Sequence, residues 1–96
     1  MAYENLREQE LSILIEERLN SLLGRKFTDQ FPMASNYILN DPKNFWEDVR
    51  LYAMEIDQIL LKRFYDECIA YKEVNKESLI RILKGLDQLK SDLHRL

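Results

Sequence analysis

Glycine, proline and cysteine are scarce in this chain. Its 96 residues include 2 Gly, 2 Pro and 1 Cys. A fold of many strands needs frequent turns, and glycine and proline are the residues that most often form them. Valine and threonine, two of the residues that favour strands, occur only at positions 28, 49 and 74. These shortages argue against a β-rich fold and favour an all-α one.

The single cysteine and the lack of long apolar runs bear on where the protein works. Cys68 has no second cysteine with which to form a disulfide inside the chain, so nothing calls for an oxidising compartment. The first residues hold no apolar run of the signal-peptide type, and no stretch approaches the roughly 18 consecutive apolar residues of a membrane span. We therefore expect a cytoplasmic protein that does not enter a membrane.

Charge is nearly balanced and slightly acidic. The chain has 14 Lys and Arg against 17 Asp and Glu, a net charge of −3. Proteins that bind phosphate backbones usually carry an excess of basic residues, so this composition argues against nucleic acid as a partner. A hydrophobic fraction of 46% in a chain of this length is typical of a single folded domain, which we place at 1–96.

The clearest pattern is an apolar stripe near the end of the sequence. Its residues recur at spacings of three and four, which place them on one side of an α-helix. The spacing predicts a helix over about 76–95, with Asn75 as its N-cap. Such a stripe is stable only when another apolar surface covers it. Its members are Leu79, Ile82, Leu86, Leu89, Leu93 and Leu96.

Three further helices are predicted upstream. The first begins with acidic residues and ends at Gly24, a residue suited to a left-handed C-cap. Asp41 followed by Pro42 is a strong helix start, and no breaker follows for about 30 residues. The predicted fold is thus all-α, a small up-and-down bundle of three long helices, about 4–23, 42–73 and 76–95, and one short helix, about 30–39.

The predicted helix over 42–73 is longer than the one that follows it. We expect the two to pair as an antiparallel helical hairpin, because short connections join antiparallel neighbours. Phe45, Trp46 and Val49 would then extend beyond the end of the shorter helix. Either the 27–39 segment or a second chain must cover them. The predicted 42–73 helix is also apolar over more than one face, and for this reason we favour a homodimer.

Large apolar residues outside the main stripes are the candidates for contacts with a protein partner. Aromatic and aliphatic side chains of this size dominate interfaces as well as cores. The candidates are Leu6, Ile13, Tyr37, Trp46 and Tyr65.

No constellation of side chains predicts catalysis, a cofactor or a metal site. His94 is the only histidine and has no carboxylate at a helical ligand spacing. Cys68 lies on an apolar stripe, where a thiol acts as a small hydrophobic group. Carboxylates occur as adjacent pairs such as Glu16 and Glu17, which point about 100° apart on a helix and so do not converge. We therefore expect a protein that is not an enzyme and needs no cofactor or metal.

One face of the last helix is a weaker candidate for nucleic-acid binding. Arg81, Lys84, Gln88 and Arg95 share this face. Acidic residues alternate with them at spacings of three and four, which leaves the face with little net charge.

These observations favour a small cytosolic protein that binds another protein, as a regulator, an adaptor or an immunity-type inhibitor, and that forms a homodimer. Two alternatives remain open. One is a nucleic-acid-associated regulator that uses the Arg81–Arg95 face, and the other is a ligand-binding or enzymatic bundle with a pocket under the 27–39 segment.

Overall fold

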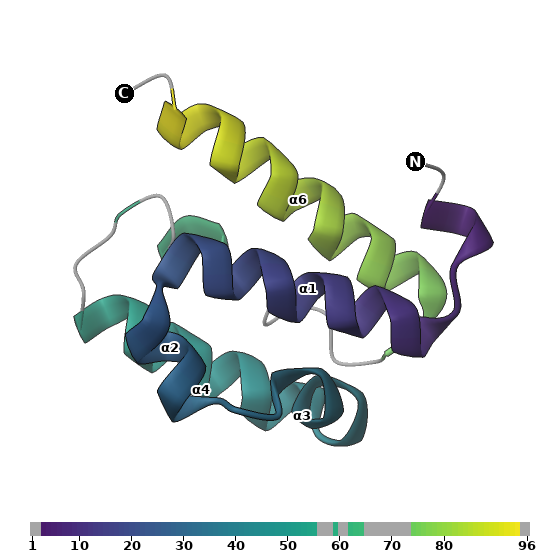
Figure 1. Cartoon of the computed structure of the whole chain (residues 1–96), viewed down its shortest axis with the longest axis horizontal. Coiled ribbons are helices and arrows are strands. Elements are labelled where there is room, and N and C mark those ends of the chain that lie inside the picture. Colours follow the sequence, from purple (N-terminus) through teal and green to yellow (C-terminus); the bar gives the residue numbers. More distant parts are fainter. Residues whose placement is uncertain (1–2, 56–58, 60–61, 65–73, 95–96) are drawn as a thin grey trace.

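A computed structural model of the protein describes residues 3–55, 59, 62–64 and 74–94. Within these residues every regular element is a helix and no strand occurs, which confirms the predicted small all-α bundle (Figure 1). Residues 59 and 62–64 are also helical. The elements are η1 (Tyr3–Asn5), α1 (Glu8–Leu23), α2 (Arg25–Gln30), α3 (Ala34–Asn40), α4 (Pro42–Glu55) and α6 (Lys76–His94).

Helix α1 lies at the centre of the arrangement. α6 packs along one side of α1 and runs in the same general direction, whereas α2 and α3 pack on the other side (Figure 1). Leu11, Ile15 and Leu19 of α1 are completely buried between these neighbours. α4 packs against α3 (Figure 1).

The apolar stripe of α6 is buried, as predicted. Leu79, Ile82, Leu86 and Leu89 are all buried, and so is Leu83, which the strict spacing of three and four had left out. Among the described elements α1 lies along α6, and the ring of Phe64, from the predicted 42–73 helix, also reaches α6 at Gly85. The side chains of Leu93 and Leu96, and residues 65–73 that would complete the predicted hairpin, lie outside the described residues.

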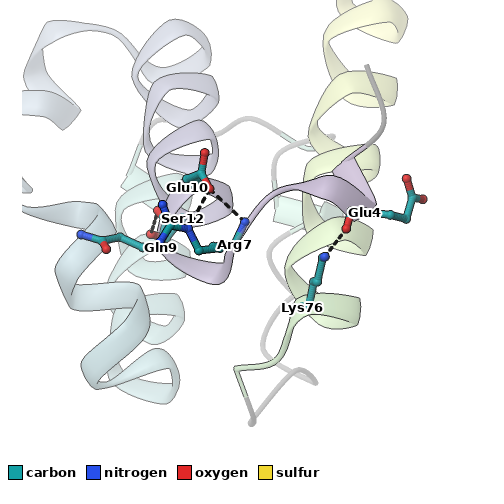
Figure 2. Close-up of polar contacts among 6 residues, drawn as sticks. All are labelled: Glu4, Arg7, Gln9, Glu10, Ser12 and Lys76. Atoms are coloured by element: carbon teal, nitrogen blue, oxygen red, sulfur yellow. Dashed lines mark hydrogen bonds and ion pairs between the residues drawn. The ribbon is translucent and has the colours of Figure 1, made fainter.

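The N-terminal helix starts later than the predicted position 4. The backbone N–H of Arg7 donates a hydrogen bond to the carboxylate of Glu10 at 3.2 Å, which satisfies a free donor at the start of α1 (Figure 2). The preceding turn, η1, leaves the line of α1 and contacts α6. Lys76 donates a hydrogen bond to the backbone carbonyl of Glu4, as Figure 2 shows.

Asp87 on α6 joins three elements of the fold. Its carboxylate accepts hydrogen bonds from the Tyr3 hydroxyl at 2.6 Å and from Arg18 Nε of α1 at 3.1 Å. These bonds raise the pKa of the Tyr3 hydroxyl and of the Arg18 guanidinium. The register between α1 and α6 is therefore set by charge as well as by apolar packing.

The predicted short helix over 30–39 is observed as α3, which starts later, and a further short helix that was not predicted, α2, precedes it. Gly24 adopts the predicted positive φ, 83°, and ends α1, after which α2 begins at once. Pro32 follows α2 and interrupts the helical hydrogen bonds, so that α3 starts only at Ala34. The carboxylate of Glu16 on α1 accepts a hydrogen bond from the backbone N–H of Ser35 at 2.6 Å and holds the start of α3 against α1.

Two predicted helix starts are confirmed. α4 begins at Pro42, directly after Asp41. α6 begins at Lys76, where the Ser78 N–H donates to the Asn75 side chain at 2.9 Å and the Asn75 N–H donates to the Ser78 hydroxyl at 3.2 Å. This reciprocal pair is the arrangement expected of an N-cap. The far end of the predicted 42–73 helix falls on residues outside the described ranges.

The large apolar side chains at the start of α4 are covered by the chain itself. The ring of Phe45 lies 6.1 Å from that of Phe31 and 5.3 Å from that of Tyr37, between ring centroids. Trp46 is only 1% exposed, and Val49 is completely buried. Of the two covers that the sequence allowed, the 27–39 segment is the one observed, so these residues require no second copy.

Truncation of Leu86 tests the packing of α6. Because this side chain is completely buried, Leu86→Ala should lower the free energy of unfolding by about 2–5 kcal/mol in urea denaturation. The matched control is Lys90→Ala on the exposed side of the same helix, which should change it by less than about 0.5 kcal/mol. Equal effects of the two substitutions would contradict the assigned face.

A second stability test concerns Gly85. A Cβ atom at this position would lie 2.7 Å from Cε2 of Phe64, too close for both atoms to stay in place. Gly→Ala inside a helix ordinarily stabilises by about 1 kcal/mol, and we expect Gly85→Ala to lose this gain. The gain should return in a Phe64→Ala background, so a double-mutant cycle should give a coupling energy of about 0.5–3 kcal/mol. Independent, additive effects would exclude the contact.

Candidate protein-binding groove

The predicted interface residues do not gather on one surface. Trp46 is a core residue with 1% of its surface exposed, and its assignment as a contact for a partner is corrected accordingly. Leu6 is half-buried against the core, and Ile13 is 43% exposed on α1. Tyr37 is half-buried on α3, while Tyr65 lies outside the described residues.

A groove of about 700 Å³ lies between the α2–α3 connection, α3 and α4, and Tyr37 is the one predicted interface residue that lines it. Met33 and Leu51 bring exposed apolar surface to it, with exposed fractions of 61% and 49%. Phe31 and Tyr52 also line it and are buried, so its apolar surface is continuous with the core. The full lining is Gln30, Phe31, Pro32, Met33, Asn36, Tyr37, Asn40, Asp48, Leu51, Tyr52 and Glu55.

A hydrogen bond joins the two helices that border the groove. The Tyr37 hydroxyl of α3 donates to the Asp48 carboxylate of α4 at 2.6 Å. This bond and the partial burial of the ring raise the pKa of Tyr37 to about 12, because ionisation would place two negative charges side by side. The neutral hydroxyl therefore fixes α3 relative to α4 at neutral pH.

The charged groups of the groove have one sign. Asp48 and Glu55 line it, and no lysine, arginine or histidine of the described residues does. Both carboxylates stand on the same side of α4 as Leu51, because residues three and four apart share a helix face. The remaining polar groups are the neutral amides Gln30, Asn36 and Asn40.

The predicted nucleic-acid face on α6 carries cations and carboxylates together. Arg81 forms an ion pair with Glu77 at 3.1 Å, and the Gln88 amide donates to Asp92 at 3.0 Å. A shallow hollow of about 520 Å³ on this face is lined by Glu4, Lys76, Glu77, Ile80, Arg81 and Lys84. Arg95 is outside the described part of the chain. The mixed lining is as the sequence predicted and offers no concentrated positive charge.

Metal binding and membrane insertion can be considered for the described residues. They contain no group of three or more histidine, cysteine, aspartate or glutamate side chains that could hold a metal ion. None of their helices combines the length and the hydrophobicity needed to cross a bilayer. Cys68 and the side chain of His94 are outside these ranges.

Met33 and Leu51 were missed as candidates. Leu51 lies off the face of the helix that carries the buried residues Phe45, Val49 and Ala53, and an apolar residue off the buried face is a signal for exposure. Met33 follows Pro32 in the break between α2 and α3, which the prediction of one continuous helix did not contain.

Comparisons with models of protein families, with curated proteins and with solved structures give no match for this chain. The groove and the faces around it are therefore interpreted from their own geometry.

Titration of Tyr37 tests the bond across the groove. An unfolded tyrosine ionises near pH 10, whereas Tyr37 in the folded protein does so at about 12, so the stabilisation from this bond is complete below pH 10 and is lost as the pH rises to about 12. Wild type should consequently lose more stability than Tyr37→Phe across this range. The difference between their ultraviolet pH titrations isolates the Tyr37 phenolate, and a midpoint near 10 would contradict the bond.

Proposed function

We propose that this protein acts by binding another protein chain in the groove between α3 and α4, and that it is not an enzyme. The observation that carries the proposal is the pair of exposed apolar side chains, Met33 and Leu51, beside the buried aromatic rings of Phe31 and Tyr52. Exposed apolar surface that is concave and bordered by polar groups is typical of protein contact sites.

The surroundings of the groove support this interpretation. Met54, three residues after Leu51 on α4, is 49% exposed, so apolar surface extends along the helix. Methionine side chains are flexible and polarisable, and they adapt to the shape of a partner. The Tyr37–Asp48 bond holds the two bordering helices together, which reduces the ordering cost of binding.

A small-molecule ligand is the second candidate, and it corresponds to the pocket expected under the 27–39 segment. The volume of about 700 Å³ falls in the range of small-molecule sites. Such sites bury most of the ligand, whereas Met33 is 61% exposed, and the open form of the groove favours a polypeptide. Nucleic acid at the Arg81 face is less well supported, because carboxylates lie among its cations.

The biological setting is part of the same proposal. We propose a cytoplasmic regulator, adaptor or inhibitor, and the supporting observation for the compartment is the single cysteine of the sequence. A second copy of the chain is one partner that the proposal allows, although Phe45, Trp46 and Val49 are buried within the chain itself.

Selection of peptide binders tests the groove. Random displayed peptides are selected on the full-length protein, and the affinity of each binder is then measured on Leu51→Asp and on the matched variant Ile13→Asp, whose apolar side chain is similarly exposed on α1. Loss of an apolar anchor from an interface costs more than about 1 kcal/mol, so Leu51→Asp should weaken binding about tenfold or more, with Ile13→Asp near wild type.

As a control, the circular dichroism of both variants should show the helix content of wild type. If the selections give no binder that depends on Leu51, the groove is not a protein-binding site. Stabilisation of wild type, but not of Leu51→Asp, by small molecules in a thermal-shift screen, without any peptide binder, would favour the second candidate.

A further inference from the structure

We infer that the groove receives a basic amphipathic segment of a different protein, in which lysine or arginine residues stand on both sides of an apolar anchor. The inference rests on the proposed function and specifies the chemistry of the partner. It depends on the placement of the two carboxylates relative to the exposed leucine.

Asp48, Leu51 and Glu55 follow one another on one side of α4, three and four residues apart. One carboxylate therefore lies about one turn before the apolar side chain and the other about one turn after it. The seven-residue separation of Asp48 and Glu55 corresponds to about 10 Å along the helix. A partner whose apolar side chain contacts Leu51 would meet negative charge at both ends of that contact.

Both carboxylates have capacity for a donor from outside the chain. Asp48 accepts the Tyr37 hydrogen bond through Oδ2, and a carboxylate oxygen pair can accept several bonds. Glu55 is exposed, and among the described residues it forms no hydrogen bond or ion pair. Among the described residues no cation lines the groove, so none of them neutralises its attraction for a basic group.

Charge also selects between a different protein and a second copy. Two copies that met groove to groove about a twofold axis would present the same surface to each other. The Asp48 and Glu55 carboxylates of both copies would then face like charges across the contact, which disfavours the pairing. The net charge of −3 extends this preference to longer range, because it favours the approach of basic partners.

The experiment uses the peptides selected on the full-length protein and a charge reversal in the groove. Leu51-dependent binders should be enriched in lysine and arginine on both sides of an apolar residue. Glu55→Lys should weaken their binding about three- to tenfold. Glu17→Lys is the matched control, since it changes the net charge equally at an exposed site on α1 outside the groove, and it should change binding by less than about twofold.

A binder with reversed charge provides a second measurement. A binder with its lysines replaced by glutamates should lose affinity for wild type and regain it on Glu55→Lys. Higher salt should weaken binding to wild type more than binding to Glu55→Lys.

Each outcome separates the inference from the proposed function. Binders that depend on Leu51 but are indifferent to Glu55→Lys, or respond equally to Glu17→Lys, would overturn the inference and leave the proposed function intact. A dimer in light scattering that dissociates in Leu51→Asp would also overturn it, because the groove would then hold a second copy. Absence of any Leu51-dependent binder would remove the proposed function itself.

Discussion

Burial of both sides of α1 is the constraint on which the rest of the structure depends. The side chains of Leu11, Ile15 and Leu19 are removed from solvent only because α6 packs on one side of α1 and α2 with α3 on the other. Hydrophobic burial of this kind has no direction, so polar bonds must select the register. Asp87 does so for α6 through Tyr3 and Arg18, and Glu16 does so for α3 through the Ser35 N–H.

The groove follows from the way in which α2 and α3 cover α4. Phe31 of the connection and Tyr37 of α3 pack on Phe45, but Pro32 separates α2 from α3, and the connection leaves Met33 exposed. On α4, Leu51 lines the same groove and is left half exposed. An apolar surface bordered by two carboxylates is the result, and we interpret it as a site for a basic partner.

Local signals predicted the elements better than their arrangement. Asn75, Pro42 and Gly24 each mark a helix boundary through a conformational preference of the residue itself, and all three boundaries are observed. The predicted start of α1 was wrong, because Arg7 and Glu10 form a cap that the acidic composition alone did not reveal. The prediction that Trp46 contacts a partner was wrong, because the side chain is buried. Whether it is exposed depends on packing between distant parts of the chain, which the sequence pattern does not give.

The sequence by itself determined that the protein is helical, where several helices begin and which residues of α6 face the core. Those properties depend on backbone preferences and on periodicity within one segment. Tertiary structure alone decided that α6 lies along α1, that Trp46 is buried within the chain, and that Met33 and Leu51 line one groove. An apolar stripe indicates that another surface must cover it but does not identify that surface. Hydrophobic contact is not selective, and many surfaces would remove the same apolar area from water.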